Sequence, residues 1–206
     1  MNLICSDLEG IFVPEIWINV AERTGIEELR LTTRDISDYD VLMKHRLKIL
    51  KERGIGLPDI QSVIGAMEPI DGALEFIDWV RATAQIIVVS DTYVEFAGPL
   101  MKKLGYPTLL CNRLEVAPDG TIENYVLRQK DGKRKVAEAM RALNYTVTAI
   151  GDSYNDITML QTAHHGILYR PPENVRREHP GFPVAGHFGE LRALVEKILR
   201  NGSRPA

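Results

Sequence analysis

The chain has 206 residues, of which 45% are hydrophobic, and carries a formal net charge of −3. This length fits one domain, or one domain with a modest insertion, and is enough to bury a sizeable core. The mild acidity gives no electrostatic reason to expect nucleic acid or an anionic membrane as a partner, so an anionic ligand would have to meet local positive charge.

The two cysteines, Cys5 and Cys111, lie in apolar stretches. This favours buried thiols over a disulfide framework, and therefore a reducing compartment. No segment approaches the roughly 20 apolar residues of a membrane span, and residues 1–13 carry acids where a signal peptide would be basic and then apolar. We expect a cytoplasmic protein. Its oligomeric state stays open, with a homodimer among the options.

Short apolar runs predict buried strands in chain order at residues 3–6, 86–90, 108–111, 146–150 and 166–169, of which the run at 108–111 is the weakest. Between the strands, apolar residues recur at helical spacing within 74–80, 100–104, 136–143 and 191–198. This alternation of strands and helices predicts an α/β fold, a doubly wound parallel sheet.

Two stretches interrupt the alternation. The sequence VAPDGTIENYV at 116–126 has strand-like flanks around a Pro-Asp-Gly turn, which predicts a β-hairpin as a local decoration. The longer interruption runs from about residue 14 to residue 70. It contains no convincing strand, but it predicts helices that end at Gly25 and at Gly54 and one that begins at Pro58.

We therefore expect a small helical cap domain over residues 14–70, inserted after the first strand, and an α/β core domain over 1–13 and 71–206. A short polar tail at 201–206 is expected to fray.

Acidic loops follow three predicted strands: SDLEG at 6–10, SDTY at 90–93 and GDSYND at 151–156. In open parallel sheets the ligand crevice lies beyond the carboxyl ends of the strands. Carboxylates that converge there repel one another strongly unless a cation lies between them. Because the donors are oxygens without His or Cys at ligand spacing, the pattern favours Mg²⁺ over Zn²⁺.

Asp7 and Asp152 are the best direct metal ligands, and Asp156, one helical turn further on, could hold the ligands in place from behind. The alternative is that each acid only caps a helix. One loop alone would leave both interpretations open, whereas three acidic loops together favour the metal.

Four motifs occur in order around the helical insertion: Asp7-Leu8-Glu9-Gly10, Ser90, Lys133 and GDSYND at 151–156. They resemble the motifs of the haloacid dehalogenase superfamily of phosphotransferases. Within it, the chain is similar to the phosphoserine phosphatase family over nearly its whole length. The closest likeness is to the bacterial branch that couples phosphoserine hydrolysis to phosphoryl transfer onto homoserine.

The resemblance agrees with the chemistry of the residues. A carboxylate can attack a dianionic phosphate monoester only if a metal and a cation offset the repulsion. Asp7 would be the nucleophile and form an aspartyl-phosphate, while Ser90 and Lys133 bind phosphoryl oxygens. Lys130 is the alternative to Lys133. By resemblance, Glu9 lends its backbone carbonyl to the Mg²⁺ on Asp7 and Asp152.

The Glu9 side chain has a second expected task, because the serine alkoxide needs a proton to leave. Glu9 can donate that proton and then act as the base toward the incoming hydroxyl. The family usually has Asp here, and the extra methylene moves the carboxyl by more than about 1 Å at full extension. We interpret this departure as a hint of altered acceptor choice.

By position, Glu15 matches the family residue that binds the substrate amine, and Arg46 matches the cap residue that binds its carboxylate. The alternative for Arg46 is an exposed helix charge. Asp91 and Thr92 occupy positions where the family commonly has two glycines. Their side chains are therefore expected beside the substrate phosphate, where the family has only backbone.

Three weaker signals complete the sequence prediction. Asn155 either orients the substrate or caps a helix. Adjacent side chains point apart, which argues against a shared metal on His164 and His165. Trp17 and Trp79 are expected in the core.

The sequence thus predicts a Mg²⁺-dependent phosphoserine phosphatase, with phosphoryl transfer to homoserine as an additional activity. The alternatives are a phosphatase of another small phosphorylated metabolite, a carbon–halogen hydrolase, and a receiver-like domain that carries a phospho-Asp. A receiver needs neither the insertion nor a general acid two residues after its Asp.

Overall fold

The computed structural model describes residues 1–32, 35–36 and 38–202. Seven strands form one sheet: β1 Asn2–Ser6, β2 Gln85–Tyr93, β3 Thr108–Val116, β4 Ile122–Val126, β5 Thr146–Gly151, β6 His165–Tyr169 and β7 Val184–Ala185. Their order is β4-β3-β2-β1-β5-β6-β7, and every pair is parallel except the antiparallel β3 and β4.

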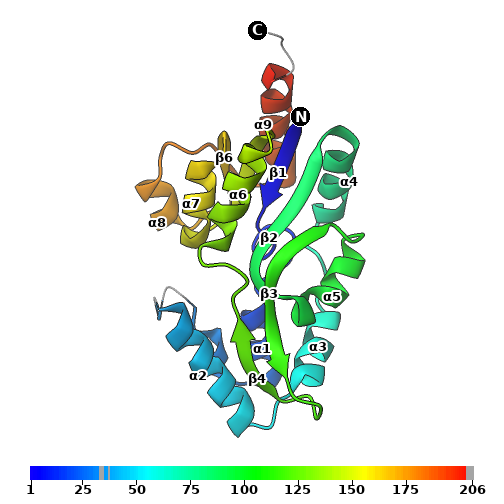
Figure 1. The fold of residues 1–206 in the computed structure, drawn as a ribbon, viewed down its shortest axis with the longest axis vertical. Helices are drawn as coiled ribbons and strands as arrows, with labels where there is room; N and C mark the ends of the chain where they lie inside the picture. The colour runs from blue at the N-terminus through cyan, green and yellow to red at the C-terminus, as the bar shows by residue number, and fades with distance from the viewer. Residues whose placement is uncertain (33–34, 37, 203–206) are drawn as a thin grey trace.

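The strand order reverses at β1, whose neighbours are β2 on one side and β5 on the other. The connections on the two sides diverge there, which leaves a crevice beyond the carboxyl end of β1. In Figure 1 this end of β1 faces the part of the molecule that holds α1, α2 and α3. The sheet therefore presents the residues after β1, β2 and β5 toward the inserted helices.

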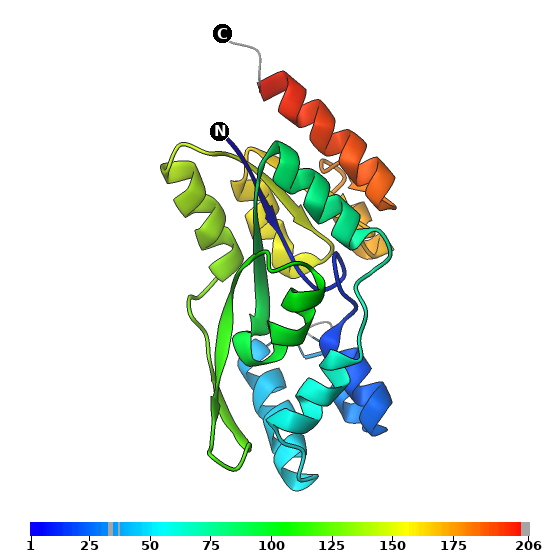
Figure 2. The ribbon, with the colours of Figure 1, turned by 90° about the vertical axis from the view of Figure 1, so that its right-hand side faces the viewer.

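Helices cover both faces of the sheet (Figure 2), namely α4 Ala73–Thr83, α5 Val94–Lys103, α6 Gly132–Ala142, α7 Ile157–Thr162, α8 Glu173–Glu178 and α9 Phe188–Gly202. Because successive strand residues point to opposite faces, Leu3 and Cys5 pack with Val136 of α6, whereas Ile4 packs with Ile77 of α4. The predicted α/β doubly wound sheet is confirmed.

Between β1 and α4 the chain forms α1 Ile16–Thr24, the short 3₁₀ helix η1 Glu27–Arg30, α2 Tyr39–Glu52 and α3 Leu57–Gly65. Two predicted helix signals are seen at helix ends: Gly25 follows α1 with φ of 70°, and Pro58 lies in the first turn of α3. Asp38, which was not predicted as a cap, caps α2 by accepting hydrogen bonds from the backbone amides of Asp40 and Val41.

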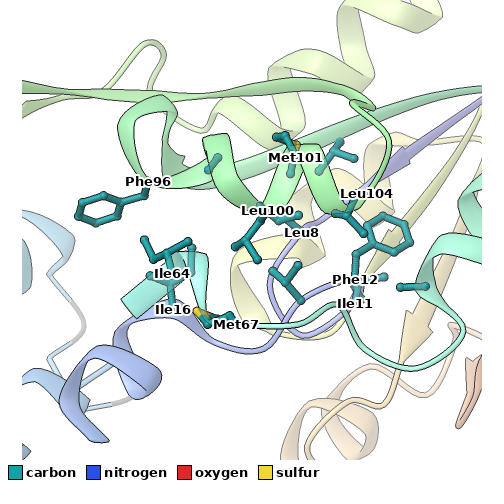
Figure 3. Close-up of a cluster of buried hydrophobic side chains, with 14 of the residues drawn as sticks. Leu8, Ile11, Phe12, Ile16, Ile64, Met67, Phe96, Leu100, Met101 and Leu104 are labelled. Atoms are coloured by element: carbon teal, nitrogen blue, oxygen red, sulfur yellow. The ribbon is translucent and has the colours of Figure 1, made fainter. Parts of the chain in front are cut away.

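One apolar cluster runs from the sheet into these inserted helices. Figure 3 shows Leu8, from the segment after β1, beside Leu100 of α5, and Phe12 and Ile64 of α3 belong to the same cluster. The end of α3 is also tied to the core, because the Lys103 ammonium donates to the backbone carbonyls of Gly65 and Met67 at 3.0 and 2.6 Å. The division into a core domain and a cap over 14–70 stays a prediction.

The hairpin predicted at 116–126 is present, but it is more than a local decoration. Its strands β3 and β4 extend the main sheet at one edge, and the Tyr125 hydroxyl donates to the Asp40 carboxylate of α2 at 2.6 Å. The strand predicted at 108–111 is longer in the structure, where β3 continues to Val116.

Other outcomes concern the ends of the fold and the thiols. The sequence pattern does not predict α8 or β7, which are only 6 and 2 residues long. Of the polar tail, 203–206 lie outside the described residues. Both cysteines are free; Cys5 is buried, whereas Cys111 is only partly buried, against expectation. Within the described part of the chain, no helix combines the length and apolar character needed to cross a bilayer.

Replacing Phe12 by Ala tests the shared apolar cluster. The ring is fully buried and lies 6.3 and 6.4 Å, centroid to centroid, from Phe76 and Phe188. Its removal should lower the free energy of unfolding by about 3–5 kcal/mol because a cavity remains. Leu143→Ala, at a side chain 64% exposed, is the control and should change it by less than about 0.5 kcal/mol. Urea unfolding measures both, and equal effects would contradict the packing argument.

Candidate active site

A cavity of about 420 Å³ lies between the carboxyl edge of the sheet and the inserted helices. From the sheet side it is lined by the last residues of β2 and by residues that follow β1, β5 and β6, including Asp7, Ser90 and Asp152. From the insertion it is lined by α1 and α2, including Trp17 and Arg46. The cavity therefore occupies the crevice expected where the strand order reverses.

Two glycines let the acidic loops approach each other. Gly10 has φ of 76°, and a Cβ there would lie 2.6 Å from a carboxylate oxygen of Asp152. A Cβ on Gly151 would lie 2.3 Å from the Cβ of Asp156. A larger residue at position 10 would thus push the loop after β1 away from Asp152, and one at position 151 would displace Asp156 within the turn after β5.

The loop after β5 is held by Asp156. One oxygen of this fully buried carboxylate accepts hydrogen bonds from the backbone amides of Asp152 and Ser153 at 3.0 and 3.1 Å. The other oxygen accepts from the Lys133 ammonium at 2.7 Å. Asp156 therefore fixes both the loop that carries Asp152 and the position of the buried cation.

The Lys133 side chain contacts both Asp7, in the loop after β1, and Asp156, in the turn after β5. Its ammonium lies 2.9 Å from Asp7 Oδ2, 2.7 Å from Asp156 Oδ1 and 3.7 Å from Asp91 Oδ2, and the side chain is only 3% exposed. Lys130 is exposed. The structure thus brings Lys133, and not the alternative Lys130, to the acidic loops.

The ionisation of this cluster is perturbed. Burial raises the pKa of Asp7 well above its usual range despite the adjacent Lys133. Burial also raises the pKa of Asp152, to about 7, and the Asp156 carboxylate adds to the shift. Burial alone would lower the pKa of Lys133, but the carboxylates of Asp156 and Asp7 raise it well above its usual value. The ammonium therefore stays charged, while the carboxyls lack positive charge to balance them.

This imbalance fits a divalent cation. Oxygens of Asp7, Asp152 and Asp156 all lie within 4.8 Å of one another. When these three carboxylates and Lys133 are ionised, their net charge is −2. The donors are all carboxylate oxygens, which hard divalent cations prefer. Because Asp156 already holds Lys133 and two backbone amides, Asp7 and Asp152 are better placed as direct ligands.

Glu9 points its partly buried carboxyl toward the insertion. Its Oε2 accepts a hydrogen bond from the backbone amide of Ile16, the first residue of α1, at 2.8 Å. Burial, and next the neighbouring Glu15 carboxylate, raise the pKa of Glu9 to about 8. Much of Glu9 is therefore protonated at neutral pH, as a proton donor must be.

The loop at the end of β2 places three polar residues in the cavity. Ser90 and Thr92 are buried, and Ser90 Oγ accepts a hydrogen bond from the Thr92 amide at 3.2 Å. Asp91 Oδ2 accepts from Asn155 Nδ2 at 3.0 Å. Asn155 therefore bridges the loops after β2 and β5 and does not cap a helix; the cap of η2 Tyr154–Asp156 is Ser153.

Arg46 is not an exposed helix charge, because it is only 5% exposed and lines the cavity. One guanidinium nitrogen donates to the Leu31 carbonyl at 2.7 Å, while the buried Nε has no hydrogen-bond partner among the described residues. The guanidinium carbon lies 4.5 Å from the ring centroid of Trp17. Glu15 is exposed and lines the same cavity.

Several residues that line the cavity differ from the sequence prediction or are absent from it. Trp17, expected only in the core, packs against Phe96 and also lines the cavity. Tyr39, Tyr93 and Arg170 were missed. Tyr93 could have been found, because it is the last residue of the acidic segment SDTY at 90–93. Tyr39, at the start of an inserted helix, has no motif that marks it.

Comparison with known proteins agrees with this geometry. The model of the family described as haloacid dehalogenase-like hydrolase matches residues 24–161. Phosphoserine phosphatase ThrH of Pseudomonas aeruginosa is 55% identical over 204 residues, which cover 99% of this chain and 98% of that protein. A phosphoserine phosphatase of Pseudomonas syringae pv. tomato is also 55% identical, over 93% of this chain and 81% of that protein.

Among solved structures, a substrate-bound phosphoserine phosphatase complex shares the fold. Its TM-score is 0.75 at 20% identity, and the match covers 95% of this chain and 97% of that one.

The raised pKa of Glu9 predicts a pH-dependent stability of the metal-free protein. Since the folded pKa of about 8 exceeds the unfolded value of about 4.3, the protonated carboxyl stabilises the fold at low pH. That contribution is lost as the pH rises toward 8, at up to about 1.4 kcal/mol per pH unit. Urea unfolding with a chelator between pH 5 and 8 should show this slope.

Glu9→Gln cannot ionise, so its unfolding free energy should fall less steeply with pH than that of the unchanged protein. Glu123→Gln, at an exposed glutamate, is the matched control and should keep the full slope. Equal slopes for Glu9→Gln and the unchanged protein would show that Glu9 ionises normally.

Proposed function

The chain belongs to the haloacid dehalogenase-like hydrolases, and on that premise we propose that it hydrolyses L-phosphoserine through an aspartyl-phosphate on Asp7, with Mg²⁺ bound. The observation that carries the proposal is the Asp7 carboxylate, 2.9 Å from a buried Lys133 ammonium and beside Asp152. The relatives that are 55% identical are named phosphoserine phosphatases, and this identity over nearly the whole chain, together with the hydrolase family, supports a phosphatase over a carbon–halogen hydrolase.

In this proposal an oxygen of Asp7 attacks phosphorus and the bond from phosphorus to the serine oxygen breaks. Lys133 and the Ser90 hydroxyl bind the phosphoryl oxygens and offset their negative charge. Mg²⁺ would be held by Asp7, Asp152 and the backbone carbonyl of Glu9, where it supplies positive charge for a phosphoryl oxygen. Asp156 acts through its hydrogen bonds, which hold Lys133 and the Asp152 loop.

Glu9 handles the protons. In the first step its carboxyl protonates the departing serine oxygen, which needs a donor that is protonated near neutral pH. The pKa of about 8 supports this role. In the second step the resulting carboxylate takes a proton from water as the water oxygen attacks the aspartyl-phosphate, which releases inorganic phosphate and restores both side chains.

The amino-acid part of the substrate would face the insertion. The buried Arg46, with its unpartnered Nε, is suited to a carboxylate, and a guanidinium binds a carboxylate in a fixed geometry. Glu15 would bind the ammonium group. Asp91, Thr92 and Asn155 line the same cavity as further substrate contacts.

Phosphoryl transfer to homoserine forms the second part of the proposal. Homoserine would replace water as the attacking hydroxyl, with Glu9 again as the base. The insertion at 14–70 would act as a lid that excludes bulk water, which lets an alcohol compete for the phosphoryl group. Cytoplasmic location and a homodimer remain predictions from the sequence.

The first test replaces Asp7 by Asn. If Asp7 is the nucleophile, phosphate release from phosphoserine with Mg²⁺ should fall by at least about 10³-fold, because no aspartyl-phosphate forms. Removal of the metal with a chelator should abolish activity, and added Mg²⁺ should restore it. Asp71→Asn, at an exposed aspartate, is the control. Activity retained by Asp7→Asn would exclude Asp7 as the nucleophile.

The second test analyses products with phosphoserine and saturating homoserine. The unchanged protein should form O-phosphohomoserine as well as inorganic phosphate. Glu9→Asp, which restores the family's usual residue, should shift the product ratio toward inorganic phosphate because the shorter side chain changes the position of the base. If inorganic phosphate is the sole product, the transfer half of the proposal fails while the hydrolysis half stands.

A further inference from the structure

Strand β2 leaves its ladder with β3 where it enters the cavity. Val89 pairs with Leu110 and Tyr93 pairs with Asn112, so that residues 90–92 oppose a single residue of β3. A bulge of this kind re-aims side chains and also removes backbone groups from the ladder. Backbone groups in the bulge therefore need hydrogen-bond partners other than the backbone of the neighbouring strand.

The carbonyl of Asp91, at the centre of the bulge, has two such partners. Asn112 Nδ2 donates to it at 3.1 Å, and the Tyr39 hydroxyl donates to it at 3.3 Å. Asn112 belongs to β3, whereas Tyr39 is the first residue of α2. One hydrogen bond to the bulge thus comes from the sheet, and the other comes from the insertion.

The Tyr39 hydroxyl is held in turn by Tyr93, with 2.7 Å between the two oxygens. A hydroxyl has one proton; because Tyr39 donates its proton to the Asp91 carbonyl, Tyr93 is the donor in this pair. Burial raises the pKa of Tyr39 to about 12, and it raises that of Tyr93 as well. Both phenols therefore keep their protons at any pH at which the enzyme would work.

We propose that Tyr39 is a positioning residue, whose hydroxyl, oriented by Tyr93, holds the bulge at 90–92 from the insertion and so places the Ser90 hydroxyl for the transferred phosphoryl group. This inference rests on the phosphoryl-binding role proposed above for Ser90. Tyr39 contacts the backbone behind Ser90 and does not need to touch the reacting atoms. The insertion then shapes the phosphoryl site as well as the amino-acid site.

Tyr125 provides a matched control, because it also joins the core to the insertion and so shows the effect of losing one such contact. Its hydroxyl also joins the core to α2, through the Asp40 carboxylate at 2.6 Å, but it makes no hydrogen bond to the bulge. In both Tyr39→Phe and Tyr125→Phe only a hydroxyl is lost, and the edge contact between the two rings, 5.8 Å apart by centroid, can persist.

The experiment compares the steady-state kinetics of these two variants on two substrates, phosphoserine and p-nitrophenyl phosphate, which has neither an ammonium nor a carboxylate group. Tyr39→Phe should lower kcat about three- to tenfold on both substrates, as expected for one lost hydrogen bond. The KM for phosphoserine should change less than about twofold. Tyr125→Phe should stay within about twofold of the unchanged protein on both. Tyr93→Phe should show a smaller loss of kcat than Tyr39→Phe.

Three outcomes would overturn the proposal. Equal losses in Tyr39→Phe and Tyr125→Phe would mean that only docking of the insertion matters. A change confined to the KM for phosphoserine would make Tyr39 a direct substrate contact. Unchanged kinetics would make the hydrogen bond to Asp91 incidental. Urea unfolding of each variant establishes that it is folded before its kinetics are compared.

The same experiment can reject the proposed substrate without rejecting the proposed role of Tyr39. If the unchanged protein cleaves p-nitrophenyl phosphate but not phosphoserine, the substrate assignment fails. The comparison of Tyr39→Phe with Tyr125→Phe on p-nitrophenyl phosphate still decides the role of Tyr39.

Discussion

The site depends on one buried ammonium placed among carboxylates. Lys133 is 3% exposed and lies within 3.0 Å of both Asp7 and Asp156. Burying a charge is costly unless it is paired, and here each partner also fixes a loop: Asp7 follows β1, and Asp156 holds the turn after β5. The same contacts that stabilise Lys133 therefore bring together the strand ends from which the cavity is built.

Lys133 neutralises only part of the negative charge of the surrounding carboxylates. Two glycines allow these carboxylates to lie close together. Gly10 and Gly151 have no room for a Cβ because the carboxylates of Asp152 and Asp156 lie against them. Burial raises the pKa of Asp7 and Asp152, and the neighbouring Asp156 carboxylate adds to both shifts. A divalent cation bound here would offset the excess negative charge.

The sequence predicted the parts of the protein that follow from local rules. Buried strands, helix ends at Gly25 and the acidic residues after β1 and β5 are all set by neighbours in the chain. The choice of Lys133 over Lys130 and the burial of Arg46 depend on which helix face meets the sheet or the cavity, and the sequence alone left both open. Tyr39 was missed because its contacts are with Tyr93 and Asp91, more than 50 residues away in the chain.

The exchange of Asp for Glu at residue 9 gains a physical reason from the structure. Helix α1 begins at Ile16 after Glu15, which makes no side-chain capping bond, so the first amide of the helix needs an acceptor. The Glu9 carboxyl supplies it at 2.8 Å. This hydrogen bond lowers the pKa of Glu9 and so offsets part of the larger rise that burial causes. An aspartate is shorter by one methylene and would reach less far toward α1. The residue proposed to move protons is therefore also the residue that joins the loop after β1 to the first inserted helix. In the proposed mechanism, proton transfer and the placement of the insertion thus depend on the same side chain.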